Sequence, residues 1–118
     1  DRSRGLGDVY KRQRLYRRES QRIESKLSIC LVSAVDSSKN ELKDIKLLEK
    51  AMDKISFSIS NSLRMRDVYT RYSRSQYLLL LLDADKSSFD GIEERIMTRF
   101  RRSKTMNSVN VKFDFKEI

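Results

Sequence analysis

Residues 67–83, DVYTRYSRSQYLLLLLD, decide the fold, because they predict two strands joined by a short polar turn. From Val68 to Ser73 the side chains alternate at the period of two that is typical of a half-buried strand, and β-branched and aromatic types dominate. Residues 77–82, YLLLLL, form an apolar run that favours a central strand covered on both faces. The turn between them lacks the glycine or asparagine that a two-residue hairpin prefers.

Upstream of this hairpin the sequence predicts a strand and then a long helix. Residues 28–35, SICLVSAV, have the apolar density of a buried strand and end in a turn-forming run at 36–40. From Glu41 to Arg64 apolar residues recur every three or four positions, and Asn40 is available as the N-cap. We therefore predict one amphipathic helix that crosses the sheet.

The sequence predicts one more helix before these elements, and a helix and a strand after them. Residues 14–27 place Tyr16, Ile23 and Leu27 along one stripe, which predicts a lead helix. Residues 83–88 are a polar connection, after which Phe89 opens a second amphipathic helix that runs to about Arg101. Residues 107–115 alternate apolar and polar side chains, which predicts a half-buried last strand.

The resulting order, βαββαβ after a lead helix, predicts an α+β fold of the ferredoxin-like type. In this fold a four-stranded antiparallel sheet carries two helices on one face. We expect a single core, made of Ile29, Leu31, Ile45, Leu48, Ile55, Ile59, Leu79, Leu81, Ile92, Ile96, Val111 and Phe113.

The N-terminal segment needs separate treatment. Ser3 to Gln13, SRGLGDVYKRQ, resembles the translation of a transposase-based sequencing adapter. We therefore interpret residues 1–13 as an adapter-derived artefact, expect them to be disordered, and leave them out of the fold prediction. On this interpretation residues 14–118 are one domain of a protein truncated at its N-terminus, from a metagenomic or draft assembly.

Composition excludes several classes of protein. The chain has 26 Lys and Arg against 17 Asp and Glu; without the four basic and two acidic residues of 1–13 the net charge is +7. Interspersed acidic residues argue against a dedicated polyanion-binding surface. There is no histidine, and Gly91 is the only glycine outside residues 1–13, so histidine-dependent catalysis and a glycine-rich phosphate loop are excluded.

The single cysteine and the short apolar runs restrict the location. Cys30 lies inside an apolar stretch and has no second cysteine to pair with, so we interpret it as a buried core residue. The longest apolar run, residues 77–82, is far too short to span a bilayer. We therefore predict a cytoplasmic domain that does not contact a membrane.

The hairpin and its lead-in, LRMRDVYTRYSRSQYLLLL, resemble the segment around the signature motif of GGDEF domains, the diguanylate cyclase family. Arg64 and Asp67 keep the family's arginine-x-x-aspartate pair, and Arg71 keeps the arginine before the motif. The five motif positions are occupied by Ser73, Arg74, Ser75, Gln76 and Tyr77. Only the final aromatic residue of the motif is retained.

The resemblance implies that the cyclase chemistry is lost. That chemistry condenses two nucleoside triphosphates and needs carboxylates to hold magnesium. The family's two metal carboxylates fall on Ser33 and Ser75, and neither is ionised at neutral pH. Gln76 replaces the motif glutamate, and Arg74 adds bulk where nucleotide would approach. Asp36 could replace Ser33 after a shift of three residues, but a single carboxylate seldom makes a magnesium site. We expect no catalytic residues, no metal and no cofactor.

Arg64 and Asp67 have two readings. In active cyclases the same pair resembles the inhibitory site that binds cyclic di-GMP, with companion basic residues that here would come from Arg66, Arg71 or a second protomer. In the structural reading, Arg64 ends the long helix, where its charge favours the helix dipole, and Asp67 caps the turn into the strand. Because such a short motif of common residues is weak evidence, the structural reading is preferred.

The segments SLRMRDVYT and RYSRSQYLLLL are also similar to the C-terminal domain of bacterial transcriptional activators of the antibiotic regulatory protein type. This implies an inactive regulatory or protein-interaction module of a transcription regulator or signalling protein. Its partners would be other domains of the parent or another protein, with a homodimer as a further option, and DNA only through a missing upstream domain. A cyclic di-GMP receptor is the alternative.

A third hypothesis is weak nucleic-acid binding on the sheet, as in RNA-recognition domains of the same βαββαβ order. That mode needs exposed aromatic residues on the two central strands. Ile29, Leu31, Leu79 and Leu81 stand there instead and leave little room for base stacking.

Overall fold

The computed structural model describes residues 26–102 and 108–118, and within them it confirms the predicted order of strands and helices. The elements, in chain order, are β1 (Leu27–Val35), α2 (Ile45–Ser60), β2 (Val68–Ser73), β3 (Gln76–Leu82), α3 (Lys86–Arg101) and β4 (Asn110–Glu117). The predicted lead helix and residues 1–13 lie outside the described residues, except that Leu27 belongs to β1 rather than to a helix. No described helix is long and apolar enough to cross a membrane.

The strands form one sheet in the order β2-β3-β1-β4, and every pairing is antiparallel. β1 is central and pairs with β3 on one side and β4 on the other. β3 lies between β1 and β2. Its apolar run is unbroken because alternate residues enter two apolar clusters: Tyr77, Leu79 and Leu81 belong to one, and Leu80 and Leu82 belong to the other. The ferredoxin-like α+β fold is therefore confirmed.

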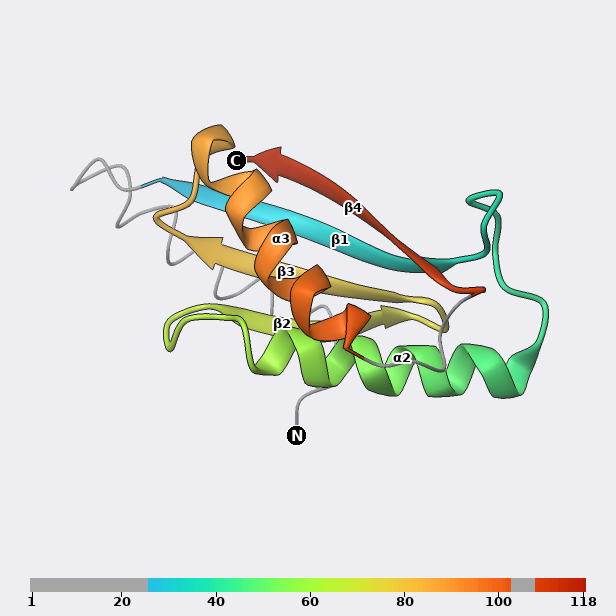
Figure 1. The fold of residues 1–118 in the computed structure, drawn as a ribbon. Helices are drawn as coiled ribbons and strands as arrows, with labels where there is room; N and C mark the ends of the chain where they lie inside the picture. Colours follow the sequence, from blue (N-terminus) through green and yellow to red (C-terminus); the bar gives the residue numbers. More distant parts are fainter. Residues whose placement is uncertain (1–25, 103–107) are drawn as a thin grey trace.

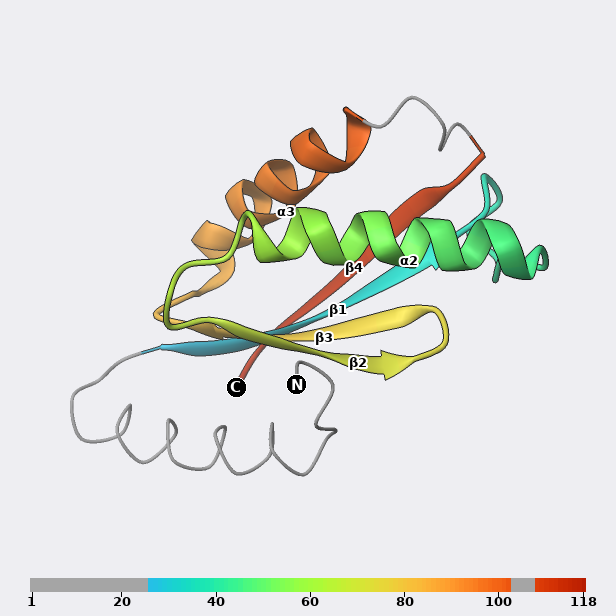
Figure 2. The same ribbon diagram turned by 90° about the horizontal axis from the view of Figure 1, so that it is seen from below.

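Both helices lie on the same face of the sheet (Figures 1 and 2). The main core lies between the two helices and the sheet. Alternate residues of β1 and β3 point toward the helices and enter this core, and the residues between them point to the opposite face. The most buried members of this core are Cys30, Val32, Ala34, Ala51, Met52, Ile55, Ile59, Leu79, Leu81, Ala84 and Ile96. Burial raises the pKa of the Cys30 thiol, which agrees with an inert core cysteine.

Part of the predicted core is wrong. Ile45, the first residue of α2, is 57% exposed. Ile29 and Leu31 are half-buried and lie on the face of β1 opposite the helices, so they are not part of the main core. Val111 and Phe113 pack against that core while remaining half-buried.

α2 is shorter than predicted at both ends. It begins at Ile45 rather than Glu41, because the Asp44 carboxylate accepts a hydrogen bond from the Leu47 amide at 3.2 Å and acts as N-cap. It ends at Ser60, and the Asn61 side chain donates to the Phe57 carbonyl at 2.8 Å. Asn40 is therefore not the cap, and Arg64 lies outside the helix.

The last helix and strand also differ from the prediction in their bounds. α3 begins three residues before Phe89, so Lys86 to Ser88 belong to the helix rather than to the polar connection. β4 begins at Asn110 and extends to Glu117, and within it Val111, Phe113 and Phe115 alternate with exposed residues as predicted.

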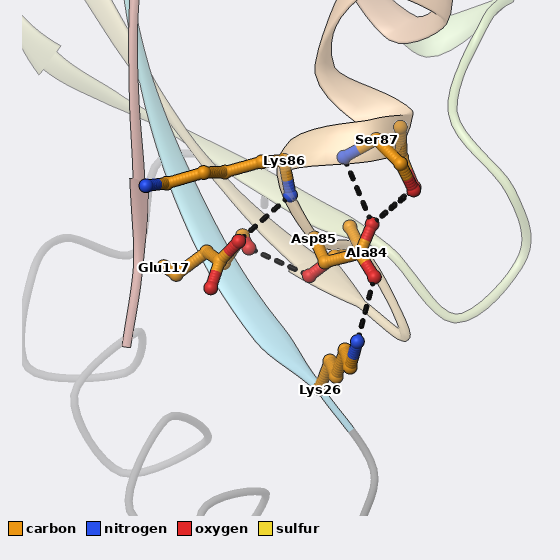
Figure 3. Close-up of polar contacts among 8 residues, drawn as sticks. Lys26, Ala84, Asp85, Lys86, Ser87 and Glu117 are labelled. Atoms are coloured by element: carbon orange, nitrogen blue, oxygen red, sulfur yellow. Dashed lines mark hydrogen bonds and ion pairs between the residues drawn. The ribbon is translucent and has the colours of Figure 1, made fainter.

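The N-terminus of α3 is fixed to the ends of two strands (Figure 3). Asp85 caps the helix by accepting from the Ser87 amide at 3.0 Å, and its other oxygen pairs with Lys26 Nζ at 2.8 Å. A carboxylate oxygen of Glu117, near the end of β4, accepts from the Lys86 amide at 2.8 Å. Two carboxylates therefore face the positive end of the helix dipole.

This corner predicts a loss of stability in acid. The hydrogen bond from Lys26, with that from Ser87, holds the pKa of Asp85 below its usual range. A group with a lowered folded-state pKa contributes stability that is complete above its unfolded pKa, about 3.9 for aspartate, and is lost as the pH falls through the folded value. We expect Asp85→Asn to lower the free energy of unfolding at pH 7, and its difference from wild type to shrink below about pH 4.

Urea denaturation between pH 2 and pH 7 measures this difference. Asp53→Asn, at an exposed position in the middle of α2, is the control and should change stability little at any pH. An Asp85→Asn deficit that stays constant across this range would contradict the assignment.

Candidate functional site

The hairpin turn that carries the motif positions is closed without glycine. Ser73 pairs with Gln76, and a register shift between Arg71 and Ser73 marks a bulge. The Arg71 guanidinium donates to the Ser73 carbonyl at 2.8 Å and to the Arg74 carbonyl at 2.7 Å, and it lies 5.5 Å from the centre of the Tyr77 ring. Arg71 thus satisfies the turn carbonyls and stabilises a turn that lacks the preferred residues.

The turn places three motif positions against the end of β1. Gln76 Nε2 donates to Ser33 Oγ at 3.1 Å, and Ser73 Oγ donates to Gln76 Oε1 at 2.9 Å. The Ser75 amide donates to Ser73 Oγ at 3.3 Å, and the Ser75 carbonyl accepts from the Ala34 amide at 2.9 Å. Four residues that the sequence analysis singled out therefore form one network, which is neutral throughout.

The donor set of this network does not fit magnesium. Mg²⁺ in nucleotide sites is bound through carboxylates, whereas this network offers hydroxyls and one amide that already bond to one another. In the described part of the chain no three His, Cys, Asp or Glu residues are grouped as metal ligands. Asp36, the possible substitute ligand, accepts from the Ser38 and Asn40 amides at 2.8 and 2.9 Å and so closes its own loop.

A cavity of about 540 Å³ lies beside the hairpin tip. Its charged lining residues are Glu41, Lys43 and Arg74, and its remaining lining residues are Asn40, Leu42, Ile45 and Leu48. The cavity is therefore bounded by the loop before α2, the first turn of α2 and the turn between β2 and β3. Arg74 contributes a long side chain at the position where the family motif has glycine.

Arg64 and Asp67 lie together in the connection between α2 and β2. One oxygen of Asp67 accepts from the Arg64 amide at 3.2 Å and from Arg64 Nε at 3.3 Å, and the other accepts from the Leu82 amide at 3.0 Å. The Arg64 guanidinium also donates to the Leu82 carbonyl. The pair thus fastens this connection to the end of β3.

The burial of the two partners differs. The Asp67 side chain is 3% exposed and both of its oxygens accept hydrogen bonds, so it meets a ligand only after one of these bonds breaks. The Arg64 side chain is half exposed. The structural reading of Asp67 as a turn cap fits these contacts, whereas the reading of Arg64 as the end of the helix is wrong.

A second cavity, of about 410 Å³, brings Arg64 next to Arg95 of α3. Ser88, Gly91 and Ile92 complete its lining. The companion bases expected from the sequence are used elsewhere: Arg66 lies 3.8 Å from the Asp83 carboxylate, and Arg71 bonds the hairpin turn. Sequence reasoning missed Arg95, because an exposed arginine on an amphipathic helix carries no signal of its own.

The central strands offer no platform for nucleic-acid bases. Among the described residues of β1 and β3 the only aromatic is Tyr77, which is buried on the helix side and hydrogen-bonds the Met52 carbonyl at 3.3 Å. Stacking on a sheet surface needs exposed rings, so the third hypothesis gains no support from these strands.

Comparison with known proteins identifies the fold. No protein-family model matches the sequence, and no curated protein matches it either. Among solved structures, a DGC protein from Thermotoga maritima superposes with a TM-score of 0.71 at 20% identity, covering 93% of this chain and 78% of that one.

Two further structures agree. The diguanylate cyclase SiaD of Pseudomonas aeruginosa, solved with its activator SiaC, gives a TM-score of 0.70 at 18% identity over 93% of this chain and 45% of that chain. The GGDEF domain of DgcB from Caulobacter crescentus, solved with c-di-GMP, gives 0.66 at 10% identity over 87% of this chain and 66% of that chain. At these identities the similarity shows a GGDEF-like nucleotide cyclase fold, while activity depends on the residues at the site.

Proposed function

We propose that this chain is a GGDEF-fold domain without cyclase activity that serves as a regulatory or protein-interaction module of a bacterial transcription regulator or signalling protein. The observation that supports it most is the neutral network of Ser33, Ser73, Ser75 and Gln76. This network includes Ser33 and Ser75, the two positions where the resemblance places metal carboxylates. The proposal places the domain in the cytoplasm, with any DNA contact made by a separate upstream domain.

The missing charge is the physical reason for inactivity. Condensing two nucleoside triphosphates requires magnesium to neutralise charge on the phosphates, and the protein supplies that metal with hard anionic ligands. Serine hydroxyls and a glutamine amide carry no charge at neutral pH. Arg74 adds a cation at the hairpin tip, but a guanidinium on an exposed side chain cannot replace a metal ion held between carboxylates.

The exposed apolar side chains support a role in protein interaction. Phe57 on the outer side of α2 is 68% exposed, and Tyr72 near the hairpin turn is also exposed. Both rings can supply contact area to a partner that covers them, and aromatic residues are enriched in interfaces. SiaD, which has the same fold, was solved with a protein activator. The partner proposed here is another domain of the parent protein, a separate protein or a second copy.

The first test is incubation of the purified chain with GTP and magnesium. We expect no cyclic dinucleotide by chromatography, because no carboxylate stands at Ser33, Ser75 or Gln76. A known diguanylate cyclase in the same buffer is the positive control. Product that forms with the wild type, disappears with Gln76→Ala and persists with the exposed-surface control Arg99→Ala would overturn the proposal.

A second candidate function, reception of cyclic di-GMP, is favoured by the cavity that Arg64 and Arg95 share. Two guanidinium groups can donate charge-assisted hydrogen bonds to phosphate oxygens or to a guanine edge, and neither contact needs a metal. The commitment of both Asp67 oxygens weighs against this candidate, because a guanine edge would have to compete with the Leu82 amide.

Calorimetric titration with cyclic di-GMP distinguishes the two candidates. For a purely structural Arg64–Asp67 pair we expect no measurable heat at high ligand concentration. Micromolar binding that is lost in both Arg64→Ala and Arg95→Ala, yet retained in Arg99→Ala further along α3, would establish the receptor function instead. Circular dichroism of each variant confirms that it is folded.

A further inference from the structure

β4 is an edge strand, and no other strand of the described chain pairs with its outer side (Figure 1). The Ile118 amide donates to the Leu27 carbonyl at 2.9 Å, so these two residues form a hydrogen-bonded pair that continues the β1–β4 ladder. In an antiparallel ladder such pairs alternate with pairs that are not hydrogen-bonded. Val111, Phe113 and Phe115 therefore direct their amide and carbonyl groups away from β1, to the side where another strand can pair with them.

A row of aromatic rings runs along this edge, on the face of the sheet that carries the helices. The Phe115 ring stacks on Phe89 of α3 with 4.4 Å between ring centres, and the Phe113 ring centre lies 6.2 Å from that of Phe115. All three side chains are half-buried. A strand added at this edge would place its own side chains beside these rings and remove apolar surface from water.

The opposite face of β4 carries charges of alternating sign. Lys112, Asp114 and Lys116 are all exposed, and Lys112 Nζ lies 3.9 Å from the Asp114 carboxylate. Lysines on an edge strand ordinarily prevent pairing between copies, because like charges meet. Here the result depends on the register, because a carboxylate stands between the two lysines.

We propose that a second copy of this chain pairs antiparallel with β4 around a two-fold axis at Phe113. In this register Phe113 faces Phe113 of the second copy, and Val111 faces Phe115. On the other face Lys112 of each copy lies opposite Asp114 of the other. Apolar side chains thus meet beside the helices and opposite charges meet on the far side, and both kinds of cross-strand pair are stabilising.

The neighbouring registers are less complementary. An axis at Asp114 would oppose the two Asp114 carboxylates and would place Lys112 opposite Lys116, so that like charges meet throughout. An axis one residue further toward the C-terminus would place Phe113 opposite the charged Glu117. The charge pattern and the apolar pattern therefore select the same register.

This inference rests on the proposed role in protein interaction and deepens it by naming the partner. The partner is a second copy, and the contact joins two sheets into one continuous sheet. The contact involves none of the motif positions in the hairpin turn. Its test measures association alone, so the result is independent of the test with GTP and magnesium.

Sedimentation equilibrium of the full chain measures this association. We expect a dimer whose dissociation constant rises by about tenfold or more in Lys112→Glu and in Asp114→Lys, because each substitution opposes like charges at two symmetry-related positions. Lys116→Glu is the matched control, with the same change of charge on the same exposed face. It lies opposite the neutral Asn110 of the second copy and should not weaken the dimer.

Mixing the two weakened variants separates the contact from an effect on folding. In a mixed dimer of Lys112→Glu with Asp114→Lys, opposite charges meet again at both positions, so the mixture should associate about as tightly as the wild type. Damage to β4 itself would not be repaired by mixing. Circular dichroism confirms that each variant is folded.

A cross-link reports the register directly. Hydrogen-bonded partners have Cα atoms about 5.5 Å apart, which suits a disulfide. Oxidation should therefore link two copies of Phe113→Cys far more readily than two copies of Asp114→Cys. Cys30 is fully buried, so the wild type should give no cross-link.

Three results would overturn the inference. One is a full chain that stays monomeric at millimolar concentration. Another is a dimer that Lys112→Glu and Asp114→Lys do not weaken, or that mixing these variants does not restore, because its contact would then lie on another surface. The third is preferential cross-linking of Asp114→Cys, which would contradict the axis at Phe113.

Discussion

Leu79→Ala is expected to lower the free energy of unfolding by about 2–5 kcal/mol. Leu79 is fully buried in β3, on the side of the sheet that faces both helices, and it belongs to the main core. Its truncation removes apolar contact and leaves a cavity that strands hydrogen-bonded on both sides cannot close. Urea denaturation followed by circular dichroism measures the difference.

Met65→Ala is the matched control, because Met65 is 100% exposed in the connection between α2 and β2. Its replacement should change the free energy of unfolding by no more than about 0.5 kcal/mol. Equal effects of the two substitutions would show that Leu79 is not in a packed core and would contradict the sheet position assigned to β3.

Asp67→Ala is expected to cost about 1–3 kcal/mol, the range for leaving a buried donor without its partner. The substitution removes the acceptor of the Leu82 amide and the acceptor of the two hydrogen bonds that Arg64 donates to Asp67. Asp67→Asn keeps one neutral acceptor for Leu82 and should cost less. Because no ligand is needed for this effect, the loss measures the structural role of the arginine-x-x-aspartate pair.

A double-mutant cycle isolates that role. Arg64→Ala and Asp67→Ala remove the two partners singly and together, and partners in direct contact show coupling of about 0.5–3 kcal/mol. The exposed pair Lys112–Asp114, whose charged atoms are 3.9 Å apart, gives the comparison and should couple weakly. Coupling no stronger than in that surface pair would remove the structural reading and favour a ligand role for Arg64.

Part of the candidate site was predictable from the sequence. The resemblance named Ser33, Ser73, Ser75 and Gln76 as motif positions, and the structure joins them by hydrogen bonds. Ser33 and Gln76 are far apart in the chain but are register partners of β1 and β3. The pairing of β1 with β3 therefore brings these two residues together.

The ends of α2 were not predictable from the sequence, because they depend on capping hydrogen bonds and on loop residues that pack against the core. The apolar period from Leu42 to Leu63 suggested a longer helix, because Leu42 and Leu63 contact the core although both lie in loops. The helix starts where Asp44 caps it, and past its end the chain is held by Asp67. Periodicity reports which residues become buried, and it does not report whether the backbone around them is helical.

The sequence by itself determined the order of strands and helices, the central position of the apolar run in β3 and the uncharged residue types at Ser33, Ser75 and Gln76. These features depend on residue type and on the two periods of 2 and 3.6, which are local properties. Only the tertiary structure decided that Asp67 is buried with both oxygens in use and that Arg95 lies beside Arg64. Such contacts join residues of separate elements, and their geometry depends on how α3 packs beside the end of α2, which no local pattern encodes.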